Sequence, residues 1–157
     1  QKIFITFVQG GRKRSDSVKN GLNALPKSCK LVHIHDCARP LIRRETISLL
    51  IENVGQNKAI ALARPVTNTI RKKLSNKECS FTETPSRNEL WEMETPQSAP
   101  KKWFLEGYAK AKKINISITD DMHAIELISK KIVLIDPGYP NPKITHIHDL
   151  KFISCLI

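Results

Sequence analysis

The chain has 157 residues, a formal net charge of +11, 40% hydrophobic residues and 6% aromatic residues. This length fits one domain that buries its own core, and the composition is that of a globular rather than a disordered protein. No run of about 18 apolar residues is present and the start lacks a secretory signal pattern, so we expect no membrane-spanning helix.

Segments typical of strands and helices alternate along the chain. The first half predicts a strand, a helix, a strand, a helix and a strand, in that order (3–8, 15–25, 30–35, 45–54 and 59–63). The second half predicts a helix, a helix, a strand, a strand and a helix (100–113, 120–130, 132–135, 143–147 and 149–156). In the helix over 45–54, apolar side chains repeat with the helical period and predict one buried face (Ile47, Leu50, Ile51 and Val54). This alternation is typical of an α/β domain with a largely parallel sheet.

Residues 64–97 interrupt the alternation. They contain Pro65, Pro85 and Pro96 together with threonines and mixed charges, a poor pattern for a core helix. Long irregular stretches in compact domains are usually functional. We therefore expect an extended arm over 64–97.

The positive charge alone does not identify a partner, because basic surfaces attract nucleic acids, anionic membranes and phosphorylated small molecules. The lysine pairs are scattered and lack interleaved aromatic residues, so we expect no nucleic-acid and no membrane partner (Lys72–Lys73, Lys101–Lys102, Lys112–Lys113 and Lys130–Lys131). An RNA-binding basic domain is the alternative, and it predicts steeply salt-dependent affinity. The four cysteines form no CxxC pair and are expected to be free thiols of an intracellular protein (Cys29, Cys37, Cys79 and Cys155).

The residues that follow the predicted strands suit a phosphorylated ligand. Parallel α/β sheets bind ligands at the carboxyl ends of their strands. Gly10 and Gly11 follow the first strand, where a side-chain-free backbone permits close approach. Asp36 and Arg39 follow the second, where an aspartate can hold a metal ion and an arginine can bind phosphate. Together they predict a phosphate-ligand site with Mg²⁺.

These segments also carry a family resemblance. The sequence His-Asp-Cys-Ala-Arg-Pro over 35–40 resembles the HDAARP motif of 2-C-methyl-D-erythritol 4-phosphate cytidylyltransferases. In the order of that family, further segments resemble GGxxRxxSVxxGL, PVxDTIK, RxxLWxxxTPQ, ITDDASAxE and NIKITxxxDL (10–22, 65–70, 87–97, 118–126 and 141–150). The motifs extend over essentially the whole chain, which makes the resemblance specific.

The chain also departs from the family pattern. Other residue types stand where the family usually has alanine, aspartate, serine, isoleucine and an acidic residue (Cys37, Asn68, His123, Pro142 and Arg12). None of these changes removes a presumed ligand side chain. The family's glycine-rich AAGxGxRM and PKQ segments, whose arginine and lysine act in the transition state, are not found in the 157 residues. We therefore expect an N-terminally incomplete domain that is inactive alone.

The resemblance implies a single Rossmann-like nucleotidyltransferase domain over 1–157, with a mainly parallel sheet and an extended dimerisation arm. It implies that CTP and 2-C-methyl-D-erythritol 4-phosphate are joined to give CDP-methylerythritol and pyrophosphate, in isoprenoid precursor biosynthesis, with Mg²⁺ as cofactor. It also implies a homodimer through the arm, in the bacterial cytoplasm or the plastid stroma, with bacteria favoured.

Residue roles follow from the same resemblance. The catalytic residues are Asp36, Arg39 and Lys143, and Asp36 also holds the metal. The nucleotide would contact the glycine turn, the following helix and the second strand end (Gly10, Gly11, Ser17, Asp36 and Cys37). The sugar-alcohol phosphate would contact the strand ends of one subunit and the arm of its partner (Arg39, Thr119 and Lys143; Thr69 and Arg87).

Other interpretations stay open. Ser17 suits a helix cap, Arg39 suits a structural pair with Asp36, and Thr119 or Asp120 suits an N-cap alone. His33, His35 and Cys37 alternate on one strand face and make a zinc site conceivable, although the spacing is unusual for zinc. The closest functional alternatives are a pentitol-phosphate cytidylyltransferase and a catalytically silent binding fragment.

Overall fold

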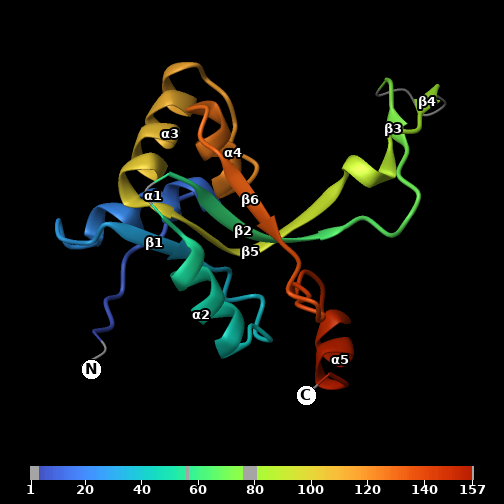
Figure 1. Ribbon diagram of the computed structural model, residues 1–157, viewed down its shortest axis with the longest axis horizontal. Coiled ribbons are helices and arrows are strands. Elements are labelled where there is room, and N and C mark those ends of the chain that lie inside the picture. Colours follow the sequence, from blue (N-terminus) through green and yellow to red (C-terminus); the bar gives the residue numbers. More distant parts are fainter. Residues whose placement is uncertain (1–3, 56, 76–80, 157) are drawn as a thin grey trace.

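A computed structural model describes residues 4–55, 57–75 and 81–156. At its centre lies a four-stranded sheet with the order β1-β5-β2-β6. These strands are β1 (Leu31–Ile34), β5 (Trp91–Pro100), β2 (Ala59–Pro65) and β6 (Ile132–Ile135). Figure 1 shows helices on both faces of this sheet, so the α/β class is confirmed.

The strand directions correct one expectation. β1, β2 and β6 run in the same direction, as a parallel α/β domain requires, but β5 pairs antiparallel with both β1 and β2. The ladders are therefore mainly antiparallel. The physical reason is the connection: the chain leaves the sheet at the end of β2 and returns beside it in the opposite direction.

The two faces of the sheet are covered by different helices. On one face lie α1 (Arg14–Ala24), α3 (Lys101–Lys113) and α4 (Asp121–Leu127), and on the other lies α2 (Arg44–Asn53). Alternate residues of β2 serve the two sides, as a strand's period of two requires. Ala59 and Ala61 pack in the cluster of Phe104, whereas Ile60 and Leu62 pack in the cluster of Leu50.

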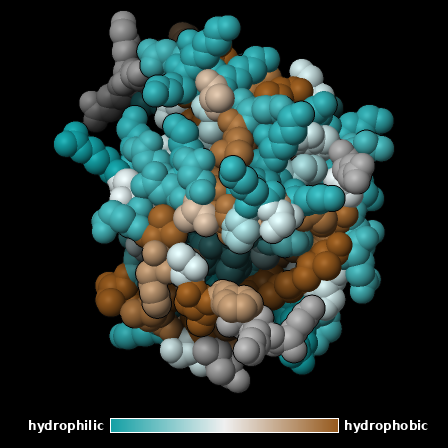
Figure 2. Space-filling model, turned by 90° about the vertical axis from the view of Figure 1, so that its left-hand side faces the viewer, coloured by the Kyte–Doolittle hydropathy of each residue, from teal (hydrophilic) through white to brown (hydrophobic). Residues whose placement is uncertain are grey.

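The predicted buried face of the helix over 45–54 is only partly buried. In α2, Leu50 and Val54 are buried, but Ile47 and Ile51 are 38% and 54% exposed. Figure 2 looks onto the side of the molecule that lies at the left of Figure 1, and shows hydrophobic surface gathered over its lower part beneath a hydrophilic upper part. Apolar residues of the 4–8 segment, Phe4 and Phe7 above all, are also exposed.

Two predicted strands are wrong in the described residues. Residues 4–8 form no regular structure, because they pair with no neighbouring strand in the described residues. Phe4 and Val8 instead line a hollow beside α1 and β1. Residues 143–147 also form no strand. Instead, the backbone N–H groups of Thr145 and His146 donate to the Asp149 carboxylate at 2.8 and 2.7 Å, which starts the short helix α5 (Asp149–Ser154).

The arm is shorter than predicted. Figure 1 shows it as a projection from the sheet, built on β3 (Lys72–Lys73), β4 (Thr82–Glu83) and the 3₁₀ helix η1 (Arg87–Glu89). Residues 91–97 are not part of it, because they form β5, where Gln97 is buried and pairs with Ile34 and Ala61. In the described residues, the arm therefore lies within 66–75 and 81–90, inside the range of about 64–97 that was predicted.

Among the described helices, none has the length and apolar composition needed to cross a membrane. Cys29, Cys37 and Cys155 are free thiols, while Cys79 lies outside the described residues.

Candidate active site

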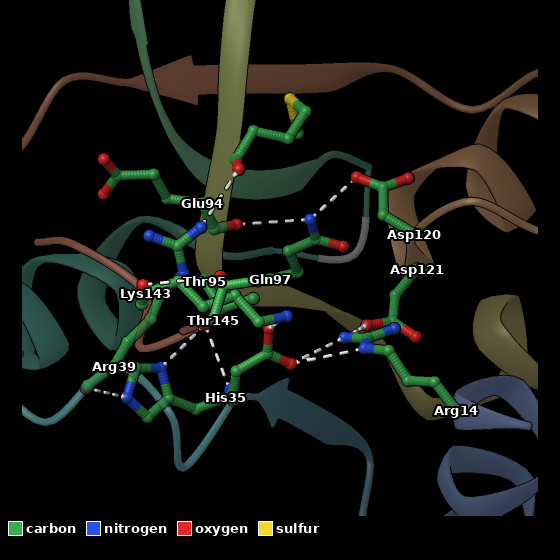
Figure 3. Close-up of polar contacts among 12 residues, drawn as sticks. Arg14, His35, Arg39, Glu94, Thr95, Gln97, Asp120, Asp121, Lys143 and Thr145 are labelled. Atoms are coloured by element: carbon green, nitrogen blue, oxygen red, sulfur yellow. Dashed lines mark hydrogen bonds and ion pairs between the residues drawn. The ribbon is translucent and has the colours of Figure 1, made fainter. Parts of the chain in front are cut away.

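A cavity of about 180 Å³ opens at the carboxyl ends of β1 and β6, beside the middle of β5. Its walls come from segments far apart in the sequence (Arg14, Asp36, Arg39, Met93, Glu94, Thr95, Gln97, Thr119, Asp120 and Lys143). This is the edge at which parallel strands present their following loops, and it is where α/β sheets bind ligands. Figure 3 shows wall residues from several elements converging, among them Arg14, Arg39 and Lys143.

Asp36 lies at the centre of the charges. Lys143 Nζ donates to its Oδ2 at 2.7 Å, and Arg14 Nη2 donates to its Oδ1 at 3.1 Å. Burial by itself would raise the pKa of the Asp36 carboxyl, but the hydrogen bond from Lys143 and the charge of Arg14 outweigh burial and hold that pKa below its usual value. Asp36 is therefore ionised at neutral pH, with a cation on each oxygen.

The turn that carries Asp36 is tied to β5. The Asp36 backbone N–H donates to Thr95 Oγ1 at 3.0 Å, and His35 Nδ1 lies 3.0 Å from the same hydroxyl. His35 Nε2 lies 3.0 Å from the Arg39 carbonyl oxygen, which can only accept, so the proton of a neutral His35 is on Nε2. Nδ1 then accepts from the Thr95 hydroxyl, and the turn is braced at both ends (Figure 3).

Arg39 has hydrogen-bonding capacity to spare. Its guanidinium donates only to backbone carbonyl oxygens, those of Asn141 and Met93, and its buried Nε has no partner among the described residues. Burial lowers its pKa from the ordinary value, although the nearby carboxylates of Glu94 and Asp36 act in the opposite direction. No ion pair of this half-buried cation is found in the part of the chain that the structure describes, so Arg39 suits an anionic ligand.

Asp120 has the structural role that the sequence left open. It caps α4 by accepting the His123 backbone N–H at 2.8 Å, and its other oxygen accepts from Gln97 Nε2 at 2.8 Å. Thr119 also lines the cavity, and its hydroxyl lies 3.2 Å from His123 Nδ1. Asp120 thus uses its carboxylate inside the protein, whereas Thr119 offers a hydroxyl at the wall.

The family model for 2-C-methyl-D-erythritol 4-phosphate cytidylyltransferase matches residues 2–157. The chain belongs to this family. The relative from Prochlorococcus marinus (strain AS9601), named 2-C-methyl-D-erythritol 4-phosphate cytidylyltransferase, is 40% identical over 98% of this chain and 68% of its own length. The relative of the same name from Clostridioides difficile (strain 630) is 36% identical over 98% of this chain and 63% of its own length. The chain thus spans about two thirds of the length of these cytidylyltransferases.

Solved structures agree with the family assignment. The 4-diphosphocytidyl-2C-methyl-D-erythritol synthase of Anaerococcus prevotii superposes with a TM-score of 0.83 at 28% identity, covering 94% of this chain and 65% of that one. The 2-C-methyl-D-erythritol 4-phosphate cytidylyltransferase of Thermus thermophilus gives a TM-score of 0.80 at 26% identity, covering 94% of this chain and 70% of that one. The nucleotidyltransferase fold expected from the motifs is confirmed.

Within this family fold, the structure gathers four of the residues singled out from the sequence. Asp36, Arg39, Thr119 and Lys143 all line the cavity. The alternative interpretation, a structural pair between Arg39 and Asp36, is not what the structure shows, because the Asp36 carboxylate is paired with Arg14 and Lys143 instead.

Other singled-out residues lie apart from the cavity lining. Ser17 Oγ accepts the Gly11 backbone N–H at 3.0 Å, so Gly10, Gly11 and Ser17 form a turn that leads into α1. Cys37 is exposed. On the arm, Arg87 Nη1 donates to the Thr67 carbonyl oxygen at 3.0 Å, and neither Thr69 nor Arg87, both described, lines this chain's cavity.

Sequence reasoning missed Arg14 and Glu94 as site residues. Arg14 stands inside the GGxxRxxSV motif, and this position is the signal that could have identified it. Glu94 is 5% exposed, pairs with Arg64 Nε at 2.8 Å and accepts from Asn141 Nδ2 at 3.0 Å. Glu94 lies beside Arg39 because β5 inserts between β1 and β2, and this strand order was not predicted from the sequence.

The carboxylates available for a metal ion are few. Among the described residues, no group of three or more histidine, cysteine and acidic side chains lies close enough together to hold a metal ion. The conceivable zinc site at His33, His35 and Cys37 is therefore not formed in the described structure. Mg²⁺ commonly takes one or two carboxylates together with substrate phosphates. Asp36, ionised and at the cavity wall, fits such a single-carboxylate site.

Proposed function

We propose that this protein transfers the cytidylyl group of CTP to 2-C-methyl-D-erythritol 4-phosphate, giving CDP-methylerythritol and pyrophosphate, in isoprenoid precursor biosynthesis. The observation that carries the proposal is the cavity at the strand ends of this chain, which belongs to the family. Asp36, Arg39, Thr119 and Lys143 all line that cavity. An oxygen of the substrate phosphate forms a bond to the α-phosphorus of CTP, and the bond from that phosphorus to the bridging oxygen of pyrophosphate breaks.

The residues of the cavity suit this reaction through charge and position. Phosphoryl-type transfer needs reactants held in line and negative charge neutralised, with little covalent work by the protein. Arg39 places a guanidinium in the cavity wall that forms no ion pair among the described residues, which suits a phosphate oxygen. Lys143 is 41% exposed, so its ammonium can turn from Asp36 toward a ligand. Thr119 adds a hydroxyl for a substrate oxygen.

Magnesium is proposed as the cofactor. Asp36 would hold it, and when bound it would neutralise charge on the triphosphate and the departing pyrophosphate. The protein's own contribution is to keep Asp36 ionised and the 36–39 turn fixed on β5.

A homodimer through the arm is also proposed. Ile70, Leu74 and Phe81 on the arm are 38%, 53% and 88% exposed, and such apolar side chains on a projection suit burial against a second copy. Thr69 and Arg87, which do not line this chain's cavity, would then reach the sugar-alcohol phosphate in the partner's site.

The experiment that tests the activity uses the complete gene product with CTP, Mg²⁺ and methylerythritol phosphate, and measures pyrophosphate release. Ribitol phosphate serves as the competing substrate, because a pentitol-phosphate cytidylyltransferase is the nearest alternative. Clear preference for methylerythritol phosphate is expected. Equal or faster turnover with ribitol phosphate would overturn the assignment.

The 157 residues by themselves are proposed to be inactive, since the family's glycine-rich segment and its basic residues are not among them. Turnover by the isolated 157-residue chain at ordinary enzyme levels would show that the catalytic groups have been assigned wrongly. Bacterial relatives such as those of Prochlorococcus and Clostridioides support the bacterial cytoplasm over the plastid stroma as the proposed location.

A further inference from the structure

A second carboxylate behind the cavity holds Arg14. Asp121 is the first residue of α4 and is 0% exposed. Its Oδ2 accepts from Arg14 Nη2 at 2.6 Å, and the same nitrogen donates to Asp36 Oδ1 at 3.1 Å. One guanidinium therefore bridges a buried carboxylate and the carboxylate of the site. Figure 3 shows Arg14 directed at Asp121.

Tyr108 completes the arrangement from α3. It is 3% exposed, and its hydroxyl donates to the other oxygen of Asp121. Burial and the negative charge of Asp121 raise the pKa of Tyr108 far above its ordinary value, so the hydroxyl stays protonated and remains a donor. Each oxygen of Asp121 thus has one donor, and the orientation of its carboxylate is fixed.

The helices that carry these residues are held close together. A Cβ added to Gly107, next to Tyr108, would lie 2.1 Å from the Ala124 carbonyl oxygen in α4, so the approach of α3 to α4 requires glycine there. This tight contact sets the distance between Tyr108 and Asp121. The arginine that they hold is 36% exposed. Without them it would keep its hydrogen bonds to Asp36 Oδ1, from Nε at 3.2 Å and from Nη2 at 3.1 Å, but its side chain would have more rotamer freedom.

We propose that Tyr108 and Asp121 are positioning residues for nucleotidyl transfer. They hold Arg14 on Asp36 and so fix one oxygen of the site's carboxylate, while neither of them touches substrate. Lys143, the other cation on Asp36, is 41% exposed and can exchange partners, so the fixed side of Asp36 is the Arg14 side. This inference rests on the proposed function, because it explains how the same site is preorganised.

The test replaces Tyr108 by phenylalanine in the complete gene product, which removes one hydroxyl and keeps the ring. We expect kcat to fall roughly three- to ten-fold, the effect of one lost hydrogen bond, with KM for both substrates within about two-fold of wild type. Tyr139→Phe is the matched control, since Tyr139 is 9% exposed and its hydroxyl contacts Thr46 Oγ1 and the Arg43 N–H, each at 3.0 Å. The control is expected to lose comparable stability but to keep its kcat.

A double-mutant cycle separates positioning from simple stabilisation. If Tyr108 acts through Arg14, adding Tyr108→Phe to Arg14→Gln changes kcat by less than about two-fold. An undiminished effect in that background, an unchanged kcat in Tyr108→Phe, or an equal loss in Tyr139→Phe would overturn the inference. Asp121→Asn, which keeps the shape and removes the charge, supplies the same test if Tyr108→Phe does not fold.

Failure of the proposed function gives a different result. If wild-type protein shows no cytidylyl transfer, the proposed function is wrong. The coupling of Tyr108 to Arg14 through Asp121 is then tested by the same double-mutant cycle, with the free energy of unfolding in urea as the measured quantity. Non-additive effects of Tyr108→Phe and Arg14→Gln on that free energy would support the coupling, and strictly additive effects would overturn it.

Discussion

The cavity and the arm are built in opposite ways, although both carry residues of the expected site. At the cavity, charged side chains from α1, α4 and the loops after β1 and β6 share hydrogen bonds, and the deepest of them, Asp121, is fully buried. On the arm, two-residue strands are joined by an exposed pair, Lys72 with Glu83 at 3.2 Å, and apolar side chains face solvent. Exposed ion pairs contribute little to stability. The difference teaches that the cavity is held together by contacts within one chain, whereas the arm leaves apolar side chains exposed that suit burial against another surface.

The largest effect is expected when two inactive mutant proteins are mixed, one damaged at the cavity and one at the arm. Asp36→Ala damages the cavity and Arg87→Ala damages the arm. If each site uses Asp36 from one subunit and Arg87 from its partner, a mixed dimer has one intact site and one doubly damaged site. Random mixing makes about half of the dimers mixed, so roughly a quarter of all sites should recover.

The measurement is turnover after the two mutants are unfolded and refolded together, with each mutant refolded alone as the control. Activity no higher than the average of the two mutants would show that Arg87 does not serve the partner's site. That result would also remove the functional interpretation of the arm.

Lys143→Ala sharpens the cavity side of the comparison. Its ammonium is expected to meet a phosphate oxygen, so the change should lower kcat/KM by about 1.5–3 kcal/mol in transition-state free energy, the range for hydrogen bonds to charged groups. Steady-state kinetics with both substrates measures the loss. Lys151→Ala, an exposed lysine on α5, is the matched control. An efficiency within about two-fold of wild type for Lys143→Ala would remove this residue from the site.

Phe81→Ser tests whether the arm contributes to a dimer interface. Phe81 is 88% exposed in the single chain, and burying a phenylalanine is worth about 1.5–3 kcal/mol, so its loss should weaken the dimer by roughly ten-fold or more. Sedimentation equilibrium measures the dissociation constant. Phe152→Ser on α5, where Phe152 is 56% exposed, removes an equivalent ring away from the arm and should leave dimerisation unchanged. Equal weakening by both changes would contradict an interface on the arm.

The smallest expected effect concerns pH and the sheet beneath the cavity. Burial lowers the pKa of His33 from its ordinary value of 6.5. The unfolded chain therefore takes up its proton first as the pH falls, and the free energy of unfolding should decrease below about pH 6.5 until the folded His33 also titrates. Urea unfolding between about pH 8 and pH 5 measures this. His33→Gln should flatten the dependence, whereas His148→Gln, 75% exposed in its side chain, should not.

Much of the fold follows from local patterns. The strands over β1, β2 and β6 and the helices α1 to α4 were predicted because apolar periodicity and capping residues act over a few neighbouring positions. The same reasoning failed for 3–8 and 143–147, where strand-like composition met no partner strand in the described part of the chain. A strand exists only when another chain segment offers its hydrogen bonds, and that partner is not encoded locally.

The sequence by itself determined the family, and its motifs supplied the candidate site residues that the structure brings to one cavity, such as Asp36, Arg39 and Lys143. The charge of these side chains is a property of the residue type and can be read from the sequence. Only the tertiary structure decided their partners. Arg14 rather than Arg39 holds Asp36, the arm ends before residue 91, and a buried tyrosine stands behind the site. These facts depend on the return of the chain through β5 and on the close packing of α3 against α4. Both join residues that are distant in sequence, and such contacts leave no local pattern to find.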